Sequence, residues 1–317
     1  MKKSFQKSLI AASVGAVMFA AVGTASANSL LFPYFTTVAG AQSVLSLSNT
    51  GTAPATQALH YVYNYGPTCV HFDATGSLTA NDILSHSIAS TAAGGFGRVV
   101  ATDTSVPVFF PLANQTGFLI VSSKTLPAID ALRGSMAIID TNTGLVVSYP
   151  GIDNAQPTQG AAGANGEGDY SAITDVNFPL TALPAGIVST SWFTIVVGNM
   201  GPVITTGANW LGGGNINNNG GAGGLGTIWN NDEVPFSGTQ TKPIVCQATI
   251  LPTDLATAAQ IAAVGTNGGL VKATFVPTSV APSVATGLIM AKIQTVLPAV
   301  GAPFAGKSFL HREQAGL

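Results

Sequence analysis

Residues 30–65 have the sequence LLFPYFTTVAGAQSVLSLSNTGTAPATQALHYVYNY, and this stretch decides the expected fold. It contains two runs of strand-forming residues, SVLSLSN and ALHYVYNY, in which side chains alternate in character. The turn-rich segment TGTAPAT joins them, so we expect an early β-hairpin or the edge of a sheet. Successive side chains of a strand point to opposite faces. The second run therefore has Tyr61, Tyr63 and Tyr65 on one face and His60, Val62 and Asn64 on the other.

The rest of the chain repeats this pattern of short apolar runs separated by Gly, Asn, Thr and Pro. IIDTNTGLVVSY predicts a second hairpin, and GLVKATFV and ATGLIMAKIQTVL predict closing strands. LPTDLATAAQIAAVG predicts one short late helix, capped by Thr253 or Asp254 and ended by Gly265. The expected fold is mainly β, an antiparallel β-sandwich of Ig-like or jelly-roll-like type, and the alternative is a closed β-barrel.

Residues 1–27 have the features of a cleaved signal peptide. Three lysines precede the apolar run LIAASVGAVMFAAVG, and Ala25-Ser26-Ala27 supplies small residues for cleavage before Asn28. The run is too short to cross a bilayer comfortably. We therefore expect a secreted or extracytoplasmic protein, in the periplasm, at the cell surface or outside the cell, with no membrane span after cleavage.

The remaining residues, 28–317, are expected to form a single β-rich unit. An alternative is two packed halves, 28–152 and 170–317, because the Gly-, Asn- and Gln-rich segment NAQPTQGAAGANGEG lies between them. A second low-complexity stretch, GGGNINNNGGAGG within 212–226, predicts a flexible surface loop.

The chain has two cysteines, Cys69 and Cys246, and an oxidising compartment favours one disulfide between them. Such a bridge would connect the two halves and so favours one unit or two intimately packed sheets. The alternative is two buried free thiols.

Charged residues make up 8% of the chain, against roughly a quarter in ordinary globular domains. The formal net charge is −2, so nucleic acid and anionic membrane surfaces are excluded as partners. Charge normally protects strand edges from association, so its scarcity favours self-association or binding to cell-envelope components. Residues 30–37 are expected to pair with a sheet edge of the same subunit or of a neighbour, with Pro33 limiting them to an edge.

A metal site is one hypothesis for Cys69, His71 and Asp73, which alternate along a strand and share a face. His60 or His86 would be a further ligand. However, Cys69 is better placed in the disulfide, and the spacing matches no CxxC or HxxxH pattern. A structural strand beside a turn is therefore the favoured interpretation, and no metal or cofactor is expected.

A glycan platform is the second hypothesis, built on the tyrosine row, with Trp192, Trp210 and Trp229 elsewhere. Aromatic rings stack on sugars but also fill cores, and the core or its rim is favoured here. Asp232 and Glu233 are neighbours and would face opposite sides of a strand, so they make a poor acid–base pair. They are expected to solvate a loop, with calcium or glycan contact as the alternative. The chain contains no G-x-S-x-G, H-E-x-x-H or Walker motif.

LLFPYF, SLSNTG and WNNDEVPFSG resemble segments of uncharacterised secreted β-rich proteins of environmental bacteria. The resemblance covers the first hairpin region and residues 228–250, and implies an extracytoplasmic β-rich protein without transferable active residues. The leading functional hypothesis is a non-enzymatic structural or adhesive protein of the cell surface that self-assembles. A glycan-binding β-sandwich module is second, and a secreted hydrolase with dispersed carboxylates is third.

Overall fold

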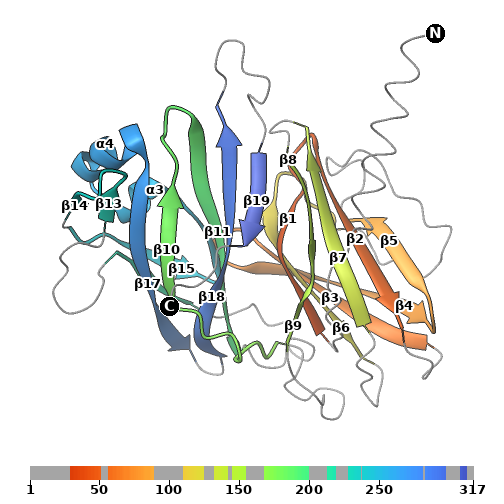
Figure 1. Cartoon of the computed structure of the whole chain (residues 1–317). Helices are drawn as coiled ribbons and strands as arrows, with labels where there is room; N and C mark the ends of the chain where they lie inside the picture. The colour runs from red at the N-terminus through yellow and green to blue at the C-terminus, as the bar shows by residue number, and fades with distance from the viewer. Residues whose placement is uncertain are drawn as a thin grey trace, which may run out of the picture.

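The computed structural model of the protein describes residues 29–50, 56–88, 110–124, 132–141, 145–154, 168–199, 213–218, 228–236, 238–280, 283–297 and 308–312. The expected signal peptide, most of the segment between the two halves, and Trp210 lie outside these ranges. The described chain is mainly β, and its sheets are antiparallel and stacked face to face (Figure 1). The β-sandwich prediction is confirmed, and the alternative of a closed barrel is wrong for the described strands.

Three sheets form the stack. The outer sheet has four strands in the order β5 (Ile83–Ser87), β2 (Ala41–Asn49), β7 (Leu132–Asp140) and β8 (Leu145–Pro150). The middle sheet has five, in the order β4 (Val70–Thr79), β3 (Thr56–Tyr65), β6 (Thr116–Ser123), β1 (Ser29–Thr36) and β9 (Ile152–Asp153).

The large sheet has ten strands, all from the second half of the chain. Its main path follows the order β14 (Pro235–Phe236), β13 (Ile228–Asn230), β17 (Gly269–Val280), β12 (Gly213–Asn217), β15 (Thr241–Val245), β16 (Gln247–Ile250), β11 (Val188–Asn199), β18 (Ser283–Val296) and β19 (Ser308–Arg312). Strand β10 (Asn177–Ala182) pairs with β17 beside this path. The predicted closing strands are β17 and β18, and residues 308–312 add β19 at the edge.

The middle sheet is buried on both faces, which explains the uninterrupted apolar sequence FLIV in β6. Leu119 and Val121 face a core shared with the outer sheet, whereas Phe118 and Ile120 face a core shared with the large sheet. A strand covered on both sides needs apolar residues at every position, not at alternate ones. The second core, between the middle and large sheets, contains buried residues from both halves of the chain.

The first predicted hairpin is wrong in its pairing, although both of its strands exist. Strand β2 pairs with β5 and β7 in the outer sheet, and β3 pairs with β4 and β6 in the middle sheet. The two strands meet face to face, with Leu45 and Leu47 of β2 in the same core as Tyr61 and Tyr63 of β3. Alternation shows which face of a strand is buried, but it does not show which strand is its neighbour. The second predicted hairpin is confirmed, because β7 pairs with β8 from Asp140 and Leu145 onward.

Strand β1 lies inside the protein and pairs with β6 along its length. Its register shifts between Phe32 and Phe35, where Pro33 has no N–H to donate. Strand β9 covers its other edge only at Leu30 and Leu31. At Tyr34 a side chain of the outer sheet, Tyr149, satisfies the free edge of β1. The Tyr34 N–H donates to the Tyr149 hydroxyl, and that hydroxyl donates to the Tyr34 carbonyl.

The segment Gly212–Gly226 is not entirely a loop, because β12 occupies its start and lies between β15 and β17. Ile216 is fully buried there and anchors the strand in the core. At Gly214 an added Cβ would lie 2.4 Å from the Phe275 ring, so a glycine is needed for that ring to pack on the strand. Glycine here permits a close approach, and flexibility is not its role.

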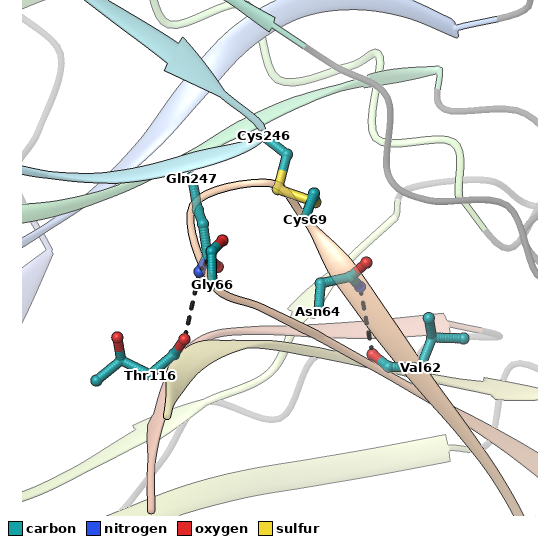
Figure 2. Close-up of a disulfide and its surroundings, with 7 residues drawn as sticks. All are labelled: Val62, Asn64, Gly66, Cys69, Thr116, Cys246 and Gln247. Atoms are coloured by element: carbon teal, nitrogen blue, oxygen red, sulfur yellow. Dashed lines mark hydrogen bonds between the residues drawn. A yellow bond between two sulfur atoms is a disulfide. The ribbon is translucent and has the colours of Figure 1, made fainter. Parts of the chain in front are cut away.

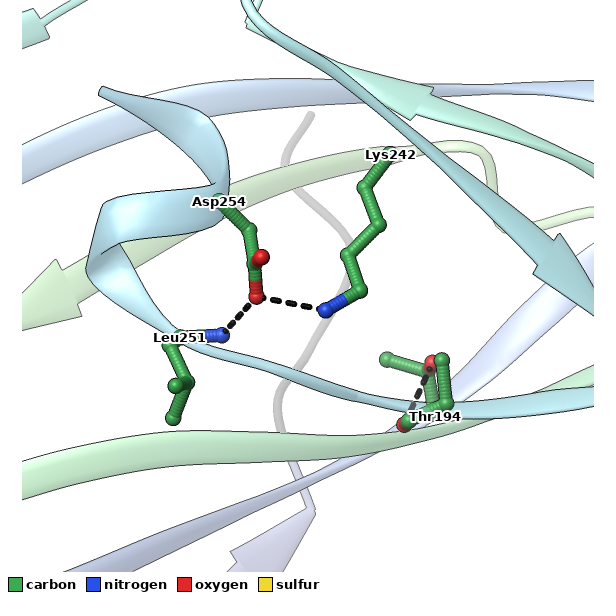
Figure 3. A network of polar contacts seen from close by, with 5 residues as sticks. Thr194, Lys242, Leu251 and Asp254 are labelled. Carbon is green, nitrogen blue, oxygen red and sulfur yellow. Dashed lines mark hydrogen bonds and ion pairs between the residues drawn. The ribbon is translucent and has the colours of Figure 1, made fainter. Parts of the chain in front are cut away.

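The predicted late helix is two helices, α3 (Pro252–Leu255) and α4 (Ala258–Asn267). Figure 3 shows the start of α3, where the Asp254 carboxylate accepts the Leu251 N–H at 2.7 Å and the Lys242 ammonium at 2.7 Å. Thr257 caps α4, because its hydroxyl accepts the Gln260 N–H while the Gln260 side chain accepts the Thr257 N–H. Gly268, with φ +80°, ends the helix, and the expected end at Gly265 is wrong.

Candidate functional site

The predicted disulfide between Cys69 and Cys246 is present, and it joins the middle sheet to the large sheet (Figure 2). Cys69 is the last residue of the turn between β3 and β4, and Cys246 is the single residue between β15 and β16. Both are buried, and their Cα atoms lie 6.0 Å apart. Both residues have a φ near +60°, a left-handed conformation that costs energy in any residue with a Cβ.

Gln247 reinforces the junction beside the disulfide. Its side-chain amide nitrogen donates to the Gly66 carbonyl at 3.0 Å and to the Thr116 carbonyl at 3.3 Å, as Figure 2 shows in part. One amide of the large sheet therefore binds two backbone segments of the middle sheet. The disulfide and these hydrogen bonds fix the two sheets at one end of their shared core.

The proposed tyrosine platform is wrong. Tyr61 and Tyr63 have no exposed surface, and Tyr65 packs partly buried against the same core. The rings of Tyr61 and Tyr63 are stacked with centroids 6.5 Å apart, and Phe35 and Phe110 contact Tyr63 edge-on or tilted. Burial raises the pKa of the Tyr63 hydroxyl well above its usual range. The tyrosine row fills the core between the outer and middle sheets because the outer sheet covers that face.

The proposed metal residues His60, His71 and Asp73 do come together, on the other face of β3 and β4. The Nε2 of His60 lies 3.2 Å from one carboxylate oxygen of Asp73, and the Nε2 of His71 lies 3.2 Å from the other. Two imidazoles thus use opposite oxygens of one carboxylate, so the three do not converge on a shared point. Within the described ranges no group of three or more His, Cys, Asp or Glu side chains could hold a metal ion. Cys69 is engaged in the disulfide.

A groove at one end of the large sheet is the candidate binding site. It has a volume of about 880 Å3, within the roughly 300–1,000 Å3 typical of small-ligand sites. Strands β10, β13 and β17, the turn after β13 and the C-terminal end of α4 form it, and Figure 1 shows these elements gathered at one side of the protein. Its lining includes Thr181, Leu183, Trp229, Asn231, Glu233, Asn267, Leu270 and Lys272.

The outer face of the large sheet forms the wall of the groove. Ile228 and Val271 point into the core, so their neighbours Trp229, Leu270 and Lys272 point outward. The Lys272 ammonium lies 4.8 Å from the centroid of the Trp229 ring, a cation–π contact that restrains the indole. Gly269 brings the strands close, because an added Cβ would lie 2.2 Å from the Trp229 carbonyl oxygen.

The rim of the groove is a tight turn, residues 230–234, held by its own hydrogen bonds. The Asn230 side-chain oxygen accepts the N–H groups of Asp232 and Val234 at 3.0 and 2.9 Å. The Asp232 carboxylate accepts the side-chain amide of Asn267 at 3.2 Å, which fastens the turn to the end of α4. Glu233 has a φ of +60°, a conformation that the turn imposes. The turn therefore presents Asn231 and Glu233 from a rigid backbone.

Sequence reasoning named Trp229, Asp232 and Glu233 but did not connect them with Lys272 or Asn267. The signal that was present is the lone lysine in GLVKATFV, a charge on the outward face of an otherwise apolar strand. The helix that carries Asn267 reaches β13 through tertiary packing, so spacing along the chain did not reveal the pair. Trp192, also a candidate for sugar stacking, is buried, with 1% of its surface exposed.

Comparisons with known proteins identify no family. No family model matches the chain, and no curated protein matches it. Among solved structures, a Thermotoga maritima protein, "Crystal Structure of Thermotoga maritima 1070", matches 42% of this chain and 98% of its own length. The two are 10% identical with a TM-score of 0.28, too low to support an argument. The resemblance to secreted β-rich proteins therefore stays a prediction.

Two observations bear on where the protein works. The buried disulfide is compatible with an extracytoplasmic location. Among the described residues, no helix has both the length and the apolar character needed to cross a membrane.

Proposed function

We propose that this is an exported protein that acts at the cell surface or outside the cell as a structural or adhesive component. The Cys69–Cys246 disulfide carries the proposal, because it is buried in the core that both halves of the chain share. Disulfides form and persist in oxidising compartments and are rare in the cytosol. Cleavage after Ala27 would leave β1 intact, since that strand begins at Ser29.

A binding role is favoured over a catalytic one by the form of the groove. Three polar side chains of its lining, those of Asn231, Glu233 and Lys272, are exposed. Groups in water can bind hydroxyls and amides, but they lack the electrostatic strength that catalysis draws from a water-excluded site. An open, rigid, partly aromatic groove on a disulfide-linked scaffold suits adhesion.

Self-assembly through a strand edge remains part of the proposal. Strand β4 has ten residues and is the end strand of the middle sheet, with His71 and Asp73 as its titratable side chains. Long edge strands with few charges invite pairing with another chain. Of the two expected pairings of residues 30–37, the structure shows the one within the same subunit, because β1 pairs with β6 and is largely buried there. Deleting residues 28–37 should unfold the protein, because Leu30, Phe32 and Phe35 of β1 are buried in the core.

Fractionation of native cells tests the proposal. Mass spectrometry should find the protein in the surface or extracellular fraction with Asn28 as its amino terminus and Cys69 linked to Cys246. Size-exclusion chromatography and negative-stain images of the same fraction then test assembly. A cytoplasmic protein that retains Met1 and has two alkylatable thiols would refute the export proposal.

A further inference from the structure

We propose that the groove at Trp229 binds a chain of neutral pyranose sugars. The inference deepens the adhesive role proposed above by naming its ligand, and it rests on the groove alone, wherever the protein is located. Three features support it: an aromatic wall, unengaged hydrogen-bonding groups beside that wall, and a rim whose charge disfavours anions.

The aromatic wall matches the apolar face of a sugar ring. A pyranose presents C–H groups on its faces and hydroxyls around its edge, and an indole offers a flat apolar surface of similar width. Trp229 is partly exposed on the outer face of the sheet. Its contact with Lys272 and its place on a paired strand hold the ring before a ligand arrives, which lowers the entropic cost of binding.

The side chains around this wall match the edge of a sugar ring, because each hydroxyl both donates and accepts. Glu233 supplies an acceptor, Lys272 a donor, and the Asn231 amide both. Within the described part of the chain, no hydrogen bond or ion pair engages the Asn231 and Glu233 side chains, whereas the Lys272 ammonium contacts the Trp229 ring and keeps its N–H donors. Asp232, in contrast, is engaged in holding the turn to Asn267.

The charge of the groove favours a neutral ligand over an acidic one. Glu233 lines the groove and Asp232 lies next to it in the same turn, whereas Lys272 is the single cation among the described residues of the lining. A uronate or a phosphate would bring a negative charge toward two carboxylates at the rim. The volume is near the upper end of the range for small-ligand sites, which suits several linked sugars better than one.

Isothermal titration of the purified mature protein tests the inference. The probes are soluble glucan, xylan, mannan and chitin oligosaccharides, with an oligogalacturonate as the acidic comparison. We expect at least one neutral oligosaccharide to bind and Trp229→Ala to weaken its binding about tenfold. Trp229→Tyr keeps a stacking face and should retain most of the affinity. Glu233→Gln and Lys272→Ala should each weaken binding about threefold.

Val276→Ala is the matched control, since Val276 is exposed on the same strand β17 outside the groove lining. Its affinity should equal that of the wild type, and far-UV circular dichroism should show every variant folded. If Trp229→Ala does not fold, the affinities of the Glu233→Gln and Lys272→Ala variants test the inference in its place. The inference is overturned if no neutral oligosaccharide binds at millimolar concentration, if only the acidic one binds, or if the groove variants bind like the control. Binding by a protein found in the cytoplasm would refute export and leave this inference standing.

Discussion

Replacing both half-cystines measures how much the Cys69–Cys246 bridge stabilises the fold. The bridge joins residues separated by 177 positions in the sequence. In the chain-entropy model, cross-linking a loop of that length stabilises the native state by about 5 kcal/mol. We expect the Cys69→Ala/Cys246→Ala double variant to lose about 4–5 kcal/mol of unfolding free energy. For a chain of this size the loss corresponds to a fall in Tm on the order of 8 °C.

A glycine pair separates the backbone contribution from that of the cross-link. Both cysteines have a φ near +60°, where a residue with a Cβ costs about 1–2 kcal/mol and glycine costs nothing. Glycine also adds roughly 0.5–1 kcal/mol of entropy to the unfolded chain at each site. The Cys69→Gly/Cys246→Gly variant should therefore be about 1–2 kcal/mol more stable than the alanine pair.

Urea unfolding followed by tryptophan fluorescence gives these free energies, with the buried Trp192 as a reporter of the large sheet. Wild-type protein treated with a reductant should unfold at the same urea concentration as the alanine pair, because both lack the cross-link. The reasoning is refuted if the alanine pair unfolds at the wild-type midpoint with an unchanged m-value. A glycine pair less stable than the alanine pair would refute the backbone part alone.

Three further predictions concern positions away from the disulfide. Gly117→Ala should lose roughly 2–3 kcal/mol of unfolding free energy, because the added Cβ would lie 2.0 Å from the Asn64 carbonyl oxygen. The control Gly186→Ala meets no atom within 4 Å, so its unfolding free energy should stay within about 0.5 kcal/mol of the wild type. Equal urea midpoints for the two variants would contradict this prediction. Burial lowers the pKa of His86, so the unfolded chain binds more protons than the native protein below about pH 6.5. The free energy of unfolding should therefore fall from pH 7 to pH 5, by at most about 1.4 kcal/mol per pH unit. His86→Leu should flatten that slope in urea titrations at each pH, and an unchanged slope would rule out this residue as its source. Asp73→Asn should lose about 0.5–1 kcal/mol of unfolding free energy, because both imidazoles lose a carboxylate partner that solvent partly screens, and a wild-type urea midpoint would show that the cluster contributes nothing.

Some features of the candidate sites could be predicted from the sequence and others could not. The disulfide followed from two cysteines and a predicted oxidising compartment, since no other pairing exists within one chain. The tyrosine row was correctly assigned to one face of β3, but the sequence did not reveal that the outer sheet covers that face. Trp229 and Glu233 were visible as residue types, and their partner Lys272 reaches them because β13 and β17 are neighbours in the large sheet.

The sequence by itself determined that the chain is mainly β, where most strands lie and which side chains of β3 share a face. These properties depend on local alternation and on turn residues. Tertiary structure decided which strands pair. Strands β2 and β3 are separated by only six residues in the sequence yet belong to different sheets, and the glycine-rich β12 becomes a central strand because Ile216 and Phe275 pack there. The physical reason is that strand pairing and face-to-face packing are decided by long-range burial of apolar surface, which short-range patterns allow in several arrangements.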